Sequence, residues 1–420
     1  MGYLQPERLR SKQRLLQVGT LLLAATITGC NISKPRLPVV LYMAVSLEDD
    51  RQVTTENSRS FRQRFTRLGK EYRALHPDVQ IQMALYDESQ LVQQLRERNQ
   101  SGLGPDLILT SGELANALLQ EGLVDPLPLN TSATDNSSPN LLNRLRNNQG
   151  KVSGQPLVIF PQLACFDRRR LKDPPGNLQA LLSAGASGHS IGLSLKLRHL
   201  IWTAGALGAI PGLRSAAAGQ PTSNQEEAAI LSWLTWLQNA NNQRSINFYP
   251  DQADLRDGLI AGQLDWVTCN SSELQRLRAT MGPNLGVSAL PNGPEHEASP
   301  LNRLRVLALG SNSSPKQRQQ ALALSEFAIK PLWQRMITME NLSMLPANPH
   351  VTVPVKSSQV LAAMQEAREQ GANSESLLNQ LESNDPRVKK LENLLIPLVF
   401  GASTPEDTAP KAIQALRRGQ

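Results

Sequence analysis

The segment PDLILTSGELANALLQEGLVDPL, residues 105–127, constrains the fold more than any other stretch of the chain. Residues 107–109 form a short apolar run, which is typical of a strand buried on both faces. A polar turn follows at residues 110–112, and apolar residues then recur at helical spacing until Gly122. This order predicts one unit of an open α/β sheet, in which ligands bind beyond the carboxyl ends of the strands.

Two similar units precede that segment. PVVLYMAV, residues 38–45, is rich in β-branched and aromatic residues and predicts a strand. Apolar residues from Phe61 to Leu75 then recur every three or four positions, which indicates an amphipathic helix that ends before Pro77. VQIQMAL, residues 79–85, alternates like a strand, and Ser89 can cap the next helix. Three strand–helix units in succession predict a parallel, doubly wound sheet.

The second half of the chain contains a long apolar run that a proline interrupts. In QPLVIFPQLACFDRRRL, residues 155–171, Pro161 suggests a strand that leaves one sheet and enters another. The polar residues 130–150 before it predict a surface loop, with room for one helical turn. After it, the pattern predicts helices at 177–184, 198–208 and 225–239, a loop at 211–224, strands within LDWVTC and LGVSALPNG, and a polar helical tail from residue 356.

The first 29 residues resemble a bacterial lipoprotein signal peptide. A basic region precedes the 15-residue apolar stretch LLQVGTLLLAATITG, which is short for a membrane-spanning helix. ITGC, with small residues before Cys30, resembles a lipobox, in which Cys30 is lipidated and becomes the mature N-terminus. An uncleaved anchor helix is the alternative. Both interpretations place the bulk of the protein outside the cytoplasm, tethered to a membrane.

The charge of the chain argues against a nucleic-acid partner. The net charge of +7 falls by three when residues 1–29 are removed, because they hold four basic residues and Glu7. The remaining +4 is mild and scattered, without the concentrated basic stripe of nucleic-acid-binding proteins.

Cysteine and histidine usage limits the chemistry of the chain. Cys165 and Cys269 could form a disulfide in an oxidising compartment, or both could be buried apolar residues. The histidines are dispersed and form no cluster with metal-ligand spacing, so we expect no metal site; they are His76, His189, His199, His296 and His350.

Six segments in sequence order resemble the extracellular solute-binding proteins of the maltose and sugar type, which serve ATP-driven importers. The segments are FTRLGKEYRALHPDVQIQMALYDESQLVQQL, SGLGPDLILTSGELANALLQEGLVDPLP, GKVSGQPLVIFPQLACFDRRRL, GLIAGQLDWVTCNSSEL, GVSALPNGPE and LIPLVFGASTPEDTAPKAIQAL. The resemblance covers nearly the whole mature chain, although no single motif decides it. The chain is similar to this family in the order of its motifs rather than in one signature.

The resemblance implies an α/β, two-lobed periplasmic-binding-protein fold, similar to type II, with a ligand cleft between lobes that hinge strands join. It implies a signal peptide at 1–29, a first lobe from 30–157 with 287–337, and a second lobe from 158–286 with 338–420. The family closes its lobes around a solute and presents the closed form to a permease, which is a hinge equilibrium biased by ligand contacts. We therefore expect a small polar solute, ABC permease subunits and the membrane as partners. We expect a monomer on the periplasmic or extracytoplasmic side, with no cofactor.

The candidate ligand-binding residues lie at strand ends or match family contact segments. They are Ser46, Glu48, Ser111, Glu113, Phe160, Gln162, His199, Trp202, Asn270, Ser271, Asn302 and Arg303. Ser111 precedes free backbone N–H groups at a helix start, where it could bind a polar solute or only cap the helix. Trp202, in RHLIWTAGALGA, matches the family's stacking tryptophan, and a helix-core tryptophan is the alternative.

Several family aromatics are replaced in this sequence, and this affects the expected ligand. His199 stands where the family has an aromatic residue, and the family tryptophan near residue 272 is absent. A large oligosaccharide is therefore disfavoured, and a sugar or polyol-type compound is expected.

Two other function classes compete with solute capture. An enzyme is disfavoured because no Gly-x-Ser-x-Gly, His-Glu-x-x-His or Ser-x-x-Lys arrangement occurs in the right context. A repurposed lipoprotein that keeps the fold but acts as a sensor or interaction protein is the stronger alternative.

Overall fold

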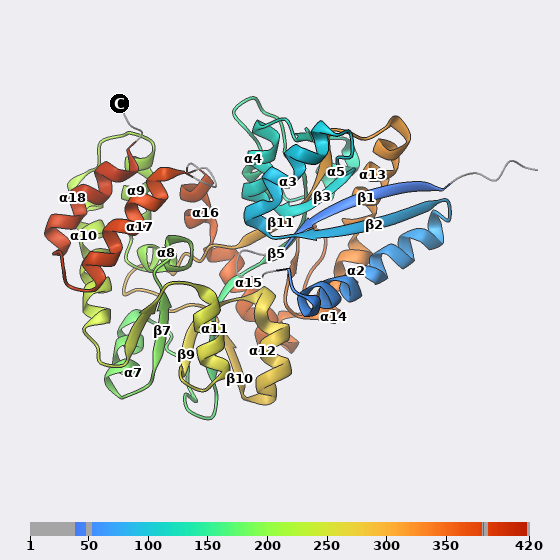
Figure 1. Cartoon of the computed structure of the whole chain (residues 1–420). Helices are drawn as coiled ribbons and strands as arrows, with labels where there is room; N and C mark the ends of the chain where they lie inside the picture. Colours follow the sequence, from blue (N-terminus) through green and yellow to red (C-terminus); the bar gives the residue numbers. More distant parts are fainter. Residues whose placement is uncertain (1–37, 48–52, 380, 382–384, 418–420) are drawn as a thin grey trace, which may run out of the picture.

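The computed structural model describes residues 38–47, 53–379, 381 and 385–417. The expected signal peptide, the expected lipidation site Cys30 and the candidate ligand residue Glu48 lie outside these residues. Figure 1 shows two lobes side by side, with the strands β5 and β11 near their junction. Within the described ranges, no helix has both the length and the apolar character needed to cross a membrane.

The first lobe is built on a sheet with the strand order β12-β5-β11-β3-β1-β2, and β4 pairs beside β11. The strands are β1 (Val39–Ser46), β2 (Val79–Tyr86), β3 (Leu107–Ser111), β4 (Val124–Asp125), β5 (Gln155–Phe160), β11 (Arg303–Gly310) and β12 (Leu345–Pro346). β1 is parallel to β2 and β3, as predicted for successive strand–helix units. β11 runs antiparallel to both β3 and β5.

The helices of the first lobe agree with the sequence patterns except at two places. They are α2 (Thr55–Leu75), α3 (Glu88–Gln100), α4 (Gly112–Gln120), α5 (Thr131–Asp135), α6 (Pro139–Arg144), α13 (Pro315–Ala328) and α14 (Pro331–Asn341). α3 begins at Glu88 with Asp87 as its N-cap residue, two residues earlier than a cap at Ser89 would give. Residues 130–150 are more helical than the predicted loop with one helical turn: they contain two short helices, α5 and α6, and Leu141 and Leu142 of α6 are buried.

The second lobe has a five-stranded sheet in the order β10-β6-β9-β7-β8. Its strands are β6 (Gln162–Asp167), β7 (Ile191–Ser194), β8 (Ile246–Tyr249), β9 (Trp266–Asn270) and β10 (Leu285–Ser288). β7 is parallel to β8 and β9, whereas β6 and β10 run antiparallel to their neighbours.

The helices around the second sheet, some of them at the junction, include three that the sequence analysis did not predict, at Ile210–Ala217, Gln252–Ile260 and Leu274–Met281. They are α7 (Leu178–Ala186), α8 (Leu197–Ala206), α9 (Ile210–Ala217), α10 (Asn224–Asn241), α11 (Gln252–Ile260), α12 (Leu274–Met281), α15 (Gln359–Gln370), α16 (Ala372–Asn379), α17 (Pro386–Val399) and α18 (Pro405–Leu416). Three 3₁₀ turns complete the described elements, at Ser271–Glu273, Gly282–Asn284 and Val355–Ser357. α9 replaces the predicted loop at 211–224, because Pro211 lies in its first turn, where proline is tolerated, and Leu213 is buried.

The C-terminal helices are less polar than the sequence pattern suggested. α17 and α18 pack against each other and against α10, and their apolar residues, such as Leu395 and Leu416, are fully buried. The tail therefore completes the core of the second lobe.

The change of sheet occurs at Pro161, between β5 and β6. Val158 and Ile159 still pair with β11 and β12 in the first sheet, whereas β6 pairs with β9 and β10 in the second. The expected boundary at 157/158 therefore falls three residues too early. The expected boundary at 286/287 also falls too early, because β10 extends to Ser288 and pairs in the second sheet. The expected boundary at 337/338 falls too early as well, because β12 pairs in the first sheet.

Alternation along β6 explains how the second sheet connects to both cores. Leu163 and Cys165 belong to the apolar cluster that continues from the first lobe, whereas Ala164 and Phe166 belong to the cluster under the helices α7 to α10. On the first of these faces, Cys165 of β6 forms a disulfide with Cys269 of β9, with the Cα atoms 5.8 Å apart. The two open alternatives for these cysteines are thus resolved in favour of the disulfide.

Candidate functional site

Strand register gathers several predicted residues around Pro161, where the chain passes between the sheets. Phe160, the last residue of β5, lies opposite Arg303 of β11. Gln162, the first residue of β6, lies opposite Asn270, the last residue of β9. The Ser271 backbone N–H donates to the Pro161 carbonyl at 2.9 Å. The carboxyl ends of strands from the two sheets therefore meet at this crossing.

Gln162 connects three parts of the chain at the crossing. Its Nε2 donates to the His199 carbonyl of α8 at 2.8 Å. Its Oε1 accepts from the Leu301 backbone N–H at 3.3 Å. The Gln162 side chain is buried, so these bonds are shielded from water. Gln162 therefore joins β6 to α8 and to the segment before β11, and Phe160, on the other side of Pro161, is also buried.

On the first-lobe side, Ser111 and Glu88 form the polar end of the parallel strands. The Ser111 hydroxyl donates to Glu88 Oε1 and accepts from the Leu114 backbone N–H at 3.3 Å. Ser111 therefore caps α4 and also binds a carboxylate, which confirms its placement at the helix start. Arg303 Nη2 lies 3.9 Å from Glu88 Oε2, so the first-lobe carboxylate is held between a hydroxyl and a guanidinium.

Ser46 is held by an arginine that the sequence analysis did not single out. Arg305 Nη2 donates to the Ser46 carbonyl at 2.6 Å and to the Leu109 carbonyl at 3.2 Å. The Ser46 hydroxyl lies 3.0 Å from the Thr110 hydroxyl. Ser46 is almost fully buried, so its contacts here fix the strand ends rather than an open surface.

An ion-pair cluster joins the two lobes through Arg144 of α6. Its guanidinium lies 3.5 Å from Glu113 of α4, in the same lobe, and 3.2 Å from Glu375 of α16, which packs on the second-lobe helices α8 and α9. Arg144 Nη2 also donates to the Asn302 carbonyl at 3.0 Å, and Asn302 Nδ2 donates to the Ala367 carbonyl at 3.0 Å. Figure 1 shows α16 on the side of its lobe that faces the first lobe.

On the second-lobe side, the end of β9 carries polar atoms with no hydrogen-bond partner within the part of the chain that the structure describes. These atoms are Asn270 Nδ2 and Ser271 Oγ, with Thr268 Oγ1 two residues earlier. Because buried polar groups normally have a partner, each of these atoms retains unused capacity to bind water or a solute. Asn270 and Ser271 lie beside Gln162 and Pro161, at the crossing.

Trp202 does not lie at the surface of the crossing. Its side chain is fully buried in the core of the second lobe, and its ring centroid lies 6.4 Å from that of Trp266. The structure therefore supports the core alternative over the stacking prediction. The helical pattern explains the difference, because seven of the eight residues from Leu197 to Ala204 in α8 are buried. His199, one turn earlier, is 9 % exposed and lies close to the crossing.

Sequence reasoning missed Glu88, Arg144 and Glu375. Glu88 lies two residues beyond the end of β2, and Ser111 is the last residue of β3, on the other side of β1, so the same strand-end signal could have found Glu88. Arg144 lies in the region predicted as a loop, and Glu375 lies in the C-terminal helices, so no local pattern connects them. Among the described residues, no group of three or more His, Cys, Asp or Glu side chains could hold a metal ion.

Comparison with known proteins agrees with this arrangement of two lobes and a polar crossing. The family described as bacterial extracellular solute-binding protein matches residues 67–364. The chain belongs to this family. By sequence comparison, none of the curated proteins matches the chain.

Solved structures of sugar-binding relatives share the fold of this solute-binding protein. The GacH receptor of Streptomyces glaucescens superposes with a TM-score of 0.68 at 14% identity, over 90% of this chain and 97% of its own. The maltose-binding periplasmic protein MalE of Listeria monocytogenes gives 0.66 at 15% identity, over 90% and 96%. A solute-binding protein of Thermotoga lettingae bound with tagatose gives 0.66 at 13% identity, over 90% and 99%. The two-lobed fold is therefore that of the sugar-binding proteins of ABC transporters.

Proposed function

We propose that this protein is the membrane-tethered solute-binding component of an ABC importer. It captures a small polar solute of sugar or polyol type by closing its lobes, and it delivers the solute to a permease. The proposal rests on the unpartnered Asn270 and Ser271 side chains at the crossing between the sheets. The sugars carried by the similar solved structures support the ligand class.

The charges around the crossing favour a neutral solute. Arg303 faces Glu88, and Arg144 faces both Glu113 and Glu375, so these cations have carboxylate partners. The remaining capacity belongs to an amide N–H donor on Asn270 and to hydroxyl groups that both donate and accept. A polyhydroxyl compound offers donors and acceptors in the same molecule, which matches these groups without adding a buried charge.

A thermal-shift screen of the protein beginning at residue 31 tests the proposed function. Sugars and polyols are the ligands, and a bound solute at a hundredfold excess over its Kd raises stability by about 2.7 kcal/mol. Calorimetry with the solute that is found should then show at least tenfold weaker binding for Asn270→Ala. Gln179→Ala, at an exposed position on α7, is the matched control. Unchanged affinity in Asn270→Ala would contradict this placement of the solute.

The tether is tested separately at Cys30. We expect Cys30→Ser to remain unprocessed or to be released from membranes, because the lipid is the expected anchor. A lipid anchor also raises the effective concentration of the protein near its permease. Mature Cys30→Ser protein that still sedimented with membranes at high salt would show that another element tethers the chain.

A repurposed sensor or interaction lipoprotein is the second candidate. One observation favours it: the Arg144–Glu375 ion pair connects the lobes directly through protein side chains. Deletion of the gene separates the candidates through uptake assays with labelled sugars. Loss of uptake of one sugar supports the importer, whereas unchanged uptake together with a lack of response in the thermal-shift screen supports the second candidate.

A further inference from the structure

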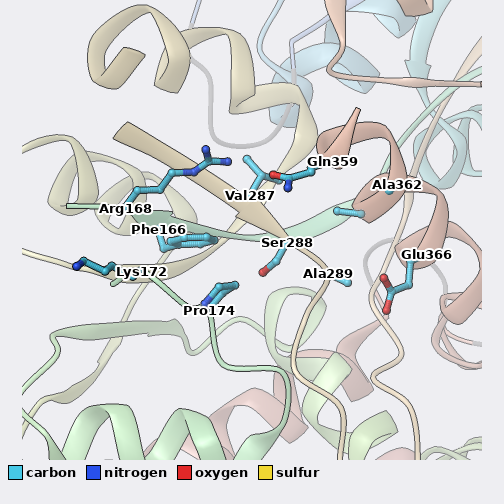
Figure 2. Close-up of a pocket in the computed structure, with 11 residues that line it drawn as sticks. Phe166, Arg168, Lys172, Pro174, Val287, Ser288, Ala289, Gln359, Ala362 and Glu366 are labelled. Carbon is cyan, nitrogen blue, oxygen red and sulfur yellow. The ribbon is translucent and has the colours of Figure 1, made fainter. Parts of the chain in front are cut away.

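A pocket of about 590 Å³ lies at the edge of the second sheet, between β6, β10 and α15. None of the candidate ligand residues at the crossing lines it. Figure 2 shows Arg168 and Lys172 on one side of the pocket and Glu366 on the other, with Phe166 and Ser288 between them. The pocket thus lies apart from the candidate residues at the crossing, and its charges are divided between two ends.

The basic end carries cations that lack a carboxylate partner. Arg168 belongs to a run of three arginines in which its two neighbours are paired: Arg169 lies 2.5 Å from Asp167, and Arg170 lies 3.0 Å from Asp265. Neither Arg168 nor Lys172 forms an ion pair with any residue that the structure describes, and both are exposed. The two cations that line the pocket are therefore available for an anionic group.

The acidic end carries a carboxylate in an unfavourable surrounding. Partial burial raises the pKa of Glu366, and repulsion from Glu297 and Glu369 raises it further. Its hydrogen-bond partner is the Gln370 side chain, with Nε2 and Oε1 3.5 Å apart, and it has no ion pair within the described residues. A cationic group placed here would attract the Glu366 carboxylate and so offset both the cost of its burial and its repulsion by Glu297 and Glu369.

The middle of the pocket is lined by apolar side chains. The wall consists of Phe166, Pro174, Val287, Ala289, Ala362 and Ala363. Gly286 lies opposite Phe166 across the strands, and a Cβ at this position would come within 2.1 Å of the Phe166 ring. The glycine therefore allows the ring to cover the edge strand. Beside the ring, Ser288 Oγ has no hydrogen-bond partner among the described residues.

We propose that this pocket is a second binding site, which takes a small zwitterion. Its anionic group binds Arg168 and Lys172, its ammonium group binds Glu366, and a short apolar body lies against Phe166. The Ser288 hydroxyl supplies one further hydrogen bond. The site goes beyond capture of a solute between the lobes and does not depend on it.

A series of ω-amino acids from 4-aminobutyrate to 8-aminooctanoate tests the site, because the series varies only the distance between the two charges. Binding to the purified full chain is measured by calorimetry, with hexanoate and hexylamine as singly charged controls. We expect one member to bind at least tenfold more tightly than either control. Glu366→Gln and the double variant Arg168→Gln/Lys172→Gln should each weaken that member at least tenfold.

Two control variants locate the binding. Lys411→Gln, exposed on α18, and Asn270→Ala, at the crossing, should both leave the affinity for the ω-amino acid unchanged. Ser288→Ala, which removes one hydroxyl from the wall, should weaken binding by a smaller factor than the charge variants. The site is overturned if no member binds at millimolar concentration, if the singly charged compounds bind equally well, or if Glu366→Gln has no effect. Binding that Asn270→Ala abolishes would move the zwitterion to the crossing and would also overturn the site.

Discussion

At the scale of single residues, burial assigns roles that residue type alone leaves open. Trp202 has the residue type of a sugar-stacking side chain, yet it has no exposed surface and packs beside Trp266. Asn270 has a less distinctive residue type, yet its amide N–H₂ lacks a partner at the crossing. The second observation indicates a ligand more directly, because an unpartnered buried polar group costs free energy until it is satisfied.

We therefore expect Trp202→Ala to act on stability. Truncation of a buried tryptophan typically costs about 3 to 5 kcal/mol, because apolar contacts are lost and a cavity remains. Denaturant unfolding measures the loss, and Trp202→Phe, which retains most of the ring volume, should lose less. Solute affinity of the folded variant should change little. A large loss of affinity with unchanged stability would instead show that the ring contacts the solute.

Glu366 gives a pH-dependent prediction. Its pKa is raised above the ordinary value of 4.5, so the folded state holds this proton more strongly than the unfolded state. The contribution of Glu366 to stability is therefore greatest below pH 4.5 and is lost as the pH rises through the folded-state pKa. Glu366→Gln should raise the melting temperature near pH 7, and the difference from the native chain should shrink toward pH 4. A difference that grows toward pH 4 would contradict the assigned direction.

At the scale of elements, local pattern predicted most of the secondary structure around the crossing. The β3–α4 unit with its Ser111 cap follows from residues within one short segment, because a strand, a polar turn and a helix each leave a local signature. The full α6 and α9 were not predicted, because both are short helices. Burial against the rest of the fold stabilises them, and a short helix has little stability of its own. Contacts such as Arg144 with Glu375 join distant segments, so no local pattern encodes them.

The disulfide between β6 and β9 gives a prediction about elements. It joins a strand that begins at the crossing to the central strand that bears Asn270, across 104 residues of sequence. Closing a loop of this size in the unfolded chain stabilises the fold by about 4.7 kcal/mol in the chain-entropy description, and measured values are commonly 2 to 5 kcal/mol. We expect Cys165→Ser/Cys269→Ser to lose stability in this range in urea unfolding. Added reductant should lower the stability of the native chain but not of the variant.

At the scale of the whole molecule, the lobes are connected by backbone at the crossing and by side chains beside it. The backbone connection includes Pro161 and the segment between β10 and β11, and it permits rotation of the lobes about a short region. The side-chain connection includes Arg144, which contacts a carboxylate in each lobe. If the lobes close around a solute as proposed, the balance between open and closed forms should depend on this cluster as well as on the solute.

The two carboxylates around Arg144 allow a matched test of that balance. Glu375→Gln removes the charge of the partner in the second lobe, whereas Glu113→Gln removes the charge of the partner within the first lobe. The Arg144 side chain is only 7% exposed and Glu375 is 16% exposed, so their pair is weakly screened by water.

We expect Glu375→Gln to raise the radius of gyration in small-angle X-ray scattering without solute, and Glu113→Gln to leave it unchanged. If the solute binds the closed form, the same loss of closed form should weaken the apparent affinity of Glu375→Gln by about tenfold, which corresponds to about 1.4 kcal/mol from the lost ion pair. Equal scattering curves for both variants would show that the backbone crossing alone sets the position of the lobes.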